Sequence, residues 1–462
     1  MRNSMNISLR DNNSYFITLL AGMGAGLSAL LAAGFIGGNL IYAVAMPFVL
    51  LLTLITFINL RYPLILILLL RPLMDPLLEM TRVDAAGQGM GVGALLNGLI
   101  ILLTGLLLLK EQPSLTRVAG RKNWLIFLSL CIFSLFASVD PAKGFRLVLN
   151  FLSYFCLFLL PFILIRKRTE ILFWLRILLA SGTMVIFAGM IDFFLGGAYY
   201  PDAGQTIRIR GPFLHPNILA FYLILVIVIC LFALEERLQL IPRLQGLLLS
   251  LMILLSGFLI LETKTRNAWI ALWLLLIIYS LLRHRRFLLP LLIMPFAALL
   301  IPSFSARVIE VFHPSHLSTN INSYAWRISV WKSTLPLIWQ SPVIGHGLAS
   351  FQLLSRSISK IAVKGGSAAH NVFLELLFET GIPGAISFVA IHAALLYSFI
   401  KESSKASRYL MVSLIASYCV ISFGDNILFY LPYNWHYWFF IGVALIYLGD
   451  GHGQIQCNHS GV

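Results

Sequence analysis

Long apolar stretches, separated by short polar segments, recur along almost the whole chain. They lie at roughly 16–36, 39–59, 62–73, 91–109, 123–138, 146–165, 171–195, 217–234, 244–261, 267–282, 287–302, 384–400, 408–424 and 434–448. Most approach the length of about 20 residues that a helix needs to cross a membrane, and none alternates as barrel strands do. The stretch at 62–73 is short, and we interpret it as a half-helix or as part of its neighbour. The pattern predicts an all-α polytopic membrane protein with about 12–14 transmembrane helices.

One long polar segment, residues 303–383, interrupts this pattern. It divides the chain into a helical bundle with short loops (1–302), a large and partly helical loop (303–383), and C-terminal helices with a tail (384–462). Within the loop, Tyr324 to Gln340 has the pattern of an interfacial helix that Pro336 would kink. Its tryptophans suit anchoring at the level of the lipid headgroups. These are Trp326, Trp331 and Trp339.

The distribution of charge predicts the topology. Charged residues make up only 11% of the chain, and the formal net charge is +15. Most of the positive charge lies in short loops, which face the cytoplasm in membrane proteins. These loops are Lys110 to Lys122, Arg166 to Arg168, Arg283 to Arg286 and Lys401 to Arg408. We therefore expect both termini in the cytoplasm and residues 303–383 on the opposite side. No basic domain that could bind a nucleic acid duplex is present, so membrane lipid is the expected partner of these charges.

The outward loops carry the candidates for chemistry. They are 196–216, the turn Glu262 to Asn267, and the long loop, where between 303 and 369 six Lys or Arg residues accompany one acid. Such an excess suits an anionic ligand, and contact with lipid headgroups is the alternative. No nucleotide-binding motif occurs, and no cysteine pair has the spacing of metal ligands. We therefore predict neither a metal site nor a cofactor.

His370 and Asn371, where the polar loop leads back into apolar sequence, are the strongest of these candidates. They open a short apolar helix that Gly381 and Pro383 end. His370 is predicted in the first turn, where the helix dipole favours neutral imidazole, the form that accepts a proton. The alternative is a histidine that only caps the helix.

Arginines on the outward loops are candidates for binding phosphate. Arg208 and Arg210 precede the turn Gly211 to Asn217, and Arg266 stands at the start of a span. A guanidinium matches phosphate oxygens bidentately, whereas snorkelling toward headgroups is the alternative for each arginine alone. In the long loop, the interfacial helix would aim Arg327 at a lipid-linked substrate. Arg208, Arg210 and Arg266, together with His370, resemble a diphosphate clamp with a base beside it.

The stretch from His370 to Gly384 resembles the signature of the bacterial O-antigen ligase and polymerase superfamily. The signature is a His, then Asn, Ser or Gln, nine residues, Gly, two residues, and Gly, Thr or Tyr. Here these are His370, Asn371, Gly381 and Gly384. The stretches Gly211 to Asn217, Lys264 to Trp269, Trp326 to Trp331 and Pro342 to Gly347 are also similar, and the similarity is strongest over roughly 205–400.

The resemblance implies a glycosyltransferase with a fold like that of the type C membrane enzymes. It would act at the periplasmic face of the bacterial inner membrane, moving a glycan from undecaprenyl diphosphate to an acceptor hydroxyl. The reaction would invert the anomeric centre without a metal ion. The implied catalytic residues are His370, Arg210 and Arg266, and the implied substrate-binding residues are Arg208, Arg327, Asn371 and Lys332. Asp202 and Asp425 are reserve candidates for the base.

Three functions remain open. A ligase would transfer the finished glycan to lipid A–core or a similar acceptor. A polymerase of the same superfamily would extend an O-antigen or exopolysaccharide. A transporter or flippase is less well supported, because the central parts of the spans look nearly free of ionisable residues and no half-chain repeat is evident.

Overall fold

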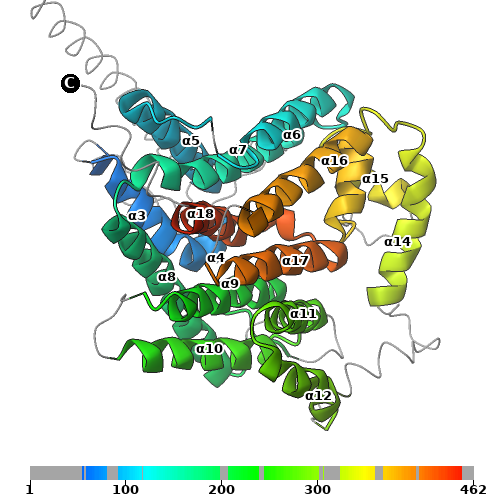
Figure 1. Ribbon diagram of the computed structural model, residues 1–462. Helices are drawn as coiled ribbons and strands as arrows, with labels where there is room; N and C mark the ends of the chain where they lie inside the picture. Colours follow the sequence, from blue (N-terminus) through cyan, green and yellow to red (C-terminus); the bar gives the residue numbers. More distant parts are fainter. Residues whose placement is uncertain are drawn as a thin grey trace, which may run out of the picture.

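The fold is a bundle of helices, seen in a computed structural model (Figure 1). The structure describes residues 55, 56, 59–80, 92–116, 118–197, 207–238, 244–300, 305, 323–358, 368–401 and 405–449. Every element assigned within these ranges is a helix. The all-α prediction is therefore confirmed for this part of the chain.

The helices follow the predicted apolar stretches closely. In the first half they are α3 (Arg61–Leu70), η1 (Arg71–Met74), α4 (Asp75–Met80), α5 (Val92–Glu111), α6 (Arg121–Ser134), η3 (Leu135–Ala137), α7 (Pro141–Leu164), α8 (Arg168–Phe194) and α9 (Pro216–Glu235). Then come α10 (Gln245–Glu262), α11 (Arg266–Leu282), η4 (Arg285–Phe287), α12 (Leu288–Ala298), α14 (Ser323–Ile338), α15 (Ser350–Ile358), α16 (Val372–Lys401), α17 (Arg408–Gly424), η5 (Ile427–Phe429) and α18 (Leu431–Leu448). The predicted spans at 16–36 and 39–59 lie almost entirely outside the described residues.

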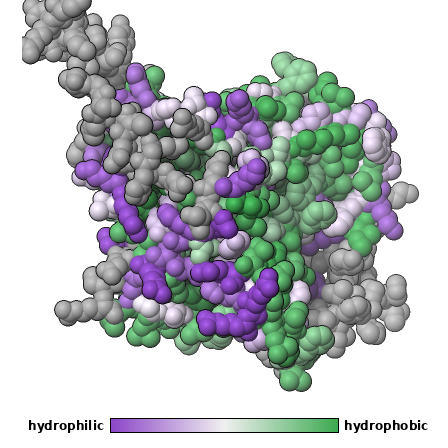
Figure 2. Space-filling model, viewed as in Figure 1, coloured by the Kyte–Doolittle hydropathy of each residue, from purple (hydrophilic) through white to green (hydrophobic). Residues whose placement is uncertain are grey.

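The described helices confirm a multi-pass membrane protein. Six of them are long and apolar enough to cross a membrane: α5, α7, α8, α9, α10 and α16. The apolar helices α11 and α17 are shorter. Figure 2 shows hydrophobic side chains over much of one face, with hydrophilic ones gathered into patches. Such extensive exposed apolar surface is typical of contact with lipid.

Helices α9 and α18 form the centre of the bundle, with α18 packed on α7, α8 and α9 (Figure 1). Aromatic rings fill much of this core. Trp438 of α18 meets Trp124 edge-on at 4.7 Å between ring centroids, and Tyr437 stacks on Tyr418 at 4.6 Å. Close-packed aromatic pairs of this kind add about 0.5–1.5 kcal/mol each beyond their buried area.

The interior also holds ionisable side chains, which corrects the expectation that the spans are nearly free of them. Arg71 and Asp75 are buried and form an ion pair of 3.1 Å, with the guanidinium over the ring of Trp435. His392 and His436 are buried as well. The predicted half-helix agrees with the position of Arg71 at a helix end, because α3 ends one residue before it and a short 3-10 turn begins there.

The predicted basic loops gather at one end of the bundle. Glu235, at the end of α9, accepts a hydrogen bond of 3.0 Å from Arg283, just after α11. Glu236 accepts bonds from Ser407, just before α17, and from Tyr447, near the end of α18. The loops 283–286 and 401–408 meet here. The loop 166–168 joins them, because Arg168 lies over the ring of Tyr447. Their shared position agrees with the predicted placement on one side of a membrane.

Helix α16 is broken at Gly381 (φ 70°, ψ −177°), where the sequence predicts one helix to end and the next to begin. The turn that precedes α15 packs against this break. Ile382 N donates to Pro342 O at 2.7 Å, and His346 N donates to Phe378 O at 2.8 Å. The predicted connector from Ser341 to Gly347 therefore holds the short first part of α16 in place.

The long loop packs on α16 through its own small core. Helix α14 confirms the predicted helix from Tyr324 to Gln340. Trp331 is partly buried and donates to Ala369 O at 2.8 Å, and its anchoring role stays a prediction. Trp339 is 72% exposed, as an interfacial anchor would be. The members of this core are Val330, Ile338, Phe351, Ala369, Leu374 and Phe378.

Gly442 provides a test of the central helix contact. A Cβ there would lie 2.6 Å from Phe158 O of α7, whereas a Cβ on Gly257 of α10 would meet nothing within 4 Å. We expect Gly442→Ala to destabilise the protein by about 1–3 kcal/mol because two backbones must separate. Thermal unfolding in detergent measures this, with Gly257→Ala as the matched helical control. Equal melting temperatures for both variants would contradict the packing of α18 on α7.

Candidate active site

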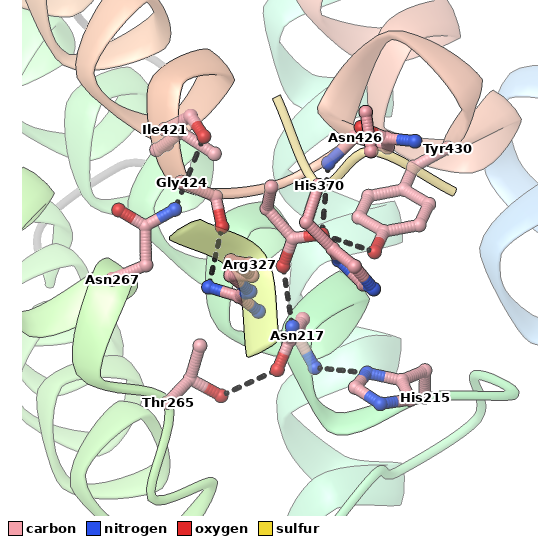
Figure 3. A network of polar contacts seen from close by, with 12 residues as sticks. His215, Asn217, Thr265, Asn267, Arg327, His370, Ile421, Gly424, Asn426 and Tyr430 are labelled. Atoms are coloured by element: carbon pink, nitrogen blue, oxygen red, sulfur yellow. Dashed lines mark hydrogen bonds and ion pairs between the residues drawn. The ribbon is translucent and has the colours of Figure 1, made fainter. Parts of the chain in front are cut away.

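A buried carboxylate, Asp425, lies just after α17, at the end of the bundle opposite the basic loops. Its side chain is 1% exposed. Oδ1 is 3.2 Å from His370 Nδ1 and accepts hydrogen bonds from Tyr430 OH (2.9 Å) and Asn426 N (2.8 Å). Oδ2 accepts a hydrogen bond from Asn217 Nδ2. Figure 3 shows the polar network to which these residues belong.

Local structure fixes the position of this carboxylate. Helix α17 ends at Gly424, and Asp425 then adopts an extended conformation (φ −160°, ψ 165°). The short segment that follows is held by Asn434, whose Nδ2 donates to Ile427 O at 2.6 Å. Tyr154 of α7 donates to Leu428 O at 3.0 Å. Asp425 is thus presented by a segment that two other helices hold in place.

His370 lies just before α16 rather than in its first turn, which corrects the prediction. Its backbone is left-handed (φ 50°), a conformation that costs a residue other than glycine about 1–3 kcal/mol. Asn371 is the residue that caps the helix, because its Oδ1 accepts a hydrogen bond of 3.1 Å from Leu374 N. The alternative of His370 as the cap is therefore wrong. Its side chain is 32% exposed and extends from Asp425 toward the surface.

The surroundings of Asp425 favour its charged form. Burial by itself would raise the pKa of this carboxyl. The hydrogen bond and charge of His370, the charge of Arg327 and the hydrogen bond from Tyr430 outweigh burial and hold the pKa below its usual range. An ionised carboxylate accepts the Nδ1 proton of His370, which leaves the basic lone pair of the neutral ring on Nε2.

Asn217 connects the carboxylate to the segment before α9 and to the turn between α10 and α11. Its Oδ1 accepts hydrogen bonds from Arg208 (3.0 Å) and Thr265 (3.2 Å). Arg208 also donates to Thr263 O at 2.7 Å, so it ties the start of α9 to the turn between α10 and α11. The predicted part of Arg208 in substrate binding stays a prediction, since here it binds protein groups.

His215 caps α9 by accepting a hydrogen bond of 3.1 Å from Asn217 N at its Nδ1. Burial, followed by the positive charge of Arg208, lowers the pKa of His215 to about 4. The ring is therefore neutral near pH 7 and can serve as an acceptor in this cap.

Two of the predicted clamp arginines border this network. Asp192 of α8 accepts hydrogen bonds from Arg210 N (2.7 Å) and Gly211 N (2.8 Å), which fixes the backbone around Arg210. The Arg210 side chain is half-buried and has no hydrogen-bond or ion-pair partner within the described ranges. Arg266 is half-buried at the start of α11, next to Thr265.

The long loop contributes one arginine to the network. Arg327 of α14 donates to Gly424 O at 2.8 Å, one residue before Asp425 (Figure 3). Its Nε is buried without a hydrogen-bond partner among the described residues. Lys332, on the same helix, is exposed and makes no hydrogen bond or ion pair with them. Only Arg327 of these two is therefore held beside the carboxylate.

Several residues of the site were not recognised as site residues in the sequence. Asn217, Thr265 and Tyr430 stand where helices begin, and Asp192 lies inside an apolar helix. The available signal was a polar side chain near the end of an apolar span. Of the reserve bases, Asp425 joins His370, and Asp202 lies outside the described residues.

One family model matches part of this chain. Residues 251–389 match the family model described as O-Antigen ligase, a range that runs from α10 to the second part of α16 and includes Arg266, Arg327 and His370. No curated protein matches the chain.

The site and fold therefore define a multi-pass helical membrane protein with an Asp–His pair at one end of its bundle. Residues 251–389 are similar to the O-antigen ligase family, and this similarity supports the resemblance of the motif from His370 to Gly384 to the O-antigen ligase and polymerase superfamily.

Proposed function

We propose that this protein is an O-antigen ligase-type glycosyltransferase. It moves a glycan from undecaprenyl diphosphate to an acceptor sugar hydroxyl, such as one of lipid A–core, at the periplasmic face of the bacterial inner membrane. The observation that carries the proposal is the contact of 3.2 Å between His370 and the buried Asp425, inside a network that also contains arginines.

In this proposal His370 is the general base. The acceptor oxygen attacks the anomeric carbon from the face opposite the diphosphate, and its proton passes to Nε2 of His370. A new C–O bond forms, the bond to the diphosphate oxygen breaks, and undecaprenyl diphosphate leaves with the electron pair. The stereochemistry inverts because a single displacement occurs. Asp425 orients the ring and stabilises the imidazolium that forms, and this kind of assistance speeds proton transfer.

The arginines stabilise charge on the leaving diphosphate. Arg210 and Arg266 are half-buried on neighbouring loops. Arg327 binds the carbonyl oxygen of Gly424, the residue before Asp425. Preorganised cations in a partly desolvated site act most strongly on charge that develops in the transition state. They can neutralise a diphosphate, so the proposed reaction is independent of metal. Asn371 contributes by fixing the first turn of α16 behind His370.

The topology supports the periplasmic assignment. The basic loops gather at the end of the bundle opposite Asp425, and short basic loops face the cytoplasm. With that orientation the His–Asp pair faces outward, where a carrier-linked glycan would present its diphosphate at the headgroup level. Membrane lipid and the carrier would share this surface.

The activity can be tested with purified protein in lipid nanodiscs and an undecaprenyl-diphosphate-linked glycan as donor. The two acceptors are lipid A–core and a second carrier-linked glycan. Glycan on lipid A–core supports a ligase. A lengthened carrier-linked glycan would make the protein a polymerase of the same superfamily. If no new glycosidic bond forms with either acceptor while the glycan crosses the bilayer, the protein is a transporter and the proposal fails.

His370→Gln tests the base directly. Glutamine keeps a similar size and some hydrogen bonding but cannot take a proton at neutral pH. We expect the rate of transfer to fall by about 10²–10⁴-fold, as for His370→Ala, with binding of the carrier-linked glycan nearly unchanged. A glutamine variant that transfers well would show that His370 only orients groups in the site.

Lysine substitutions test the diphosphate clamp. Arg210→Ala and Arg266→Ala should each lower the rate by about 10²–10³-fold, because a charge contact in the transition state is lost. Arg210→Lys and Arg266→Lys should restore little, since lysine lacks the bidentate fork. The exposed Lys122→Ala on α6, away from the site, serves as a control for loss of general positive charge. Near-full activity of both lysine variants would exclude a bidentate clamp at these positions.

A further inference from the structure

Glu375 is a buried carboxylate on α16, five residues after His370 and 6% exposed. A single oxygen of this side chain accepts two hydrogen bonds. Its Oε2 accepts from Ala369 N at 3.0 Å and from Asn426 Nδ2 at 2.7 Å. Neither donor belongs to the His–Asp pair itself, yet each is its immediate neighbour in the chain.

The arrangement joins the two segments that carry the pair. Ala369 directly precedes His370, and Asn426 directly follows Asp425. One atom of Glu375 therefore ties the two segments together, in addition to the His370–Asp425 contact. Two segments tied at two points cannot slide or rotate past each other as they could with one.

Ala369, the residue before His370, is held through both of its backbone polar groups. Its N–H group binds Glu375, and its carbonyl accepts the hydrogen bond from the Trp331 indole of α14. The left-handed backbone of His370 needs such support, because the chain would relax toward a more favourable conformation without it. Glu375 is thus well placed to determine where the imidazole stands.

We propose that Glu375 is a positioning residue for the His370–Asp425 pair. This inference rests on the proposed function, since it deepens the account of the same site. Glu375 does not touch substrate. It keeps the imidazole aligned with Asp425 and with the acceptor hydroxyl by accepting hydrogen bonds from Ala369 N, just before His370, and from the side-chain amide of Asn426, just after Asp425.

The geometry predicts which side chains can replace Glu375. Both donors bind one oxygen, so the carbonyl oxygen of a glutamine can serve both, and charge is not required. Aspartate keeps the charge but is one methylene shorter, so it cannot reach both donors. Leucine has a similar size and accepts nothing. Positioning therefore predicts activity in the order Glu, then Gln, then Asp and Leu.

The test measures kcat, and KM for the carrier-linked donor, for Glu375→Gln, Glu375→Asp and Glu375→Leu, each normalised to folded protein. We expect Glu375→Gln to stay within a few-fold of the wild type. Glu375→Asp and Glu375→Leu should lose about 10–100-fold in kcat with little change in KM, because a displaced base slows the chemical step alone. A double variant that combines Glu375→Asp or Glu375→Leu with Asp425→Asn should lose little more kcat than Asp425→Asn alone, since both changes remove the same alignment of His370.

Glu379, one helical turn further along, provides the matched control. It is buried too, but its carboxylate accepts from Phe351 N at 3.0 Å, away from His370. Glu379→Gln should keep the wild-type kcat.

Three results would overturn the inference. The first is a higher kcat for Glu375→Asp than for Glu375→Gln. The second is a change in KM for the donor with kcat unchanged. The third is a double variant with Asp425→Asn whose loss in kcat equals the product of the two single losses. A failure of the proposed function is distinguishable, because the wild-type protein would then form no glycosidic bond. If Glu375→Leu does not fold, the comparison of glutamine with aspartate decides.

Discussion

The site depends on one constraint: a charged carboxylate, Asp425, is almost completely excluded from solvent. Burying a charge is costly unless hydrogen bonds and opposite charge compensate it. Here the compensation comes from His370, Asn217 and Tyr430, which belong to segments far apart in the chain. Satisfying this one group therefore brings together the start of α9, the residues before α16 and the turn between α17 and α18.

The packing around α16 converts that constraint into a rigid site. A Cβ on Gly345 would lie 2.4 Å from the backbone of Glu379, and a Cβ on Gly381 would lie 2.5 Å from Val343 O. Gly345 and Gly381 thus allow the connector and the break in α16 to pack backbone against backbone. The loop around α14 adds Arg327 and Trp331 to the same end of the bundle, so the largest loop of the chain supports the site rather than only covering it.

Much of this was predictable from sequence, for physical reasons. The spans were predictable from the length of the apolar stretches. The break at Gly381 was predictable because this glycine and Pro383 both disfavour a continuous helix. His370 stood out because it stands where the polar loop leads back into apolar sequence. The pairing of His370 with Asp425 was not predictable, because the two residues are 55 positions apart and meet only through the packing of helices in three dimensions. The burial of Glu375 was missed for the same reason, since a helix next to a polar loop gives no sequence signal of which face is covered.

The rate of glycan transfer by Asp425→Asn tests the central claim most directly. An amide can accept hydrogen bonds at only one of its two atoms, so its NH₂ group must face a donor that now binds the carboxylate. Loss of the oriented His–Asp pair should lower the single-turnover rate by about 10²–10⁴-fold while carrier-linked glycan still binds. A folded Asp425→Asn protein that transfers glycan at nearly the wild-type rate would contradict the account.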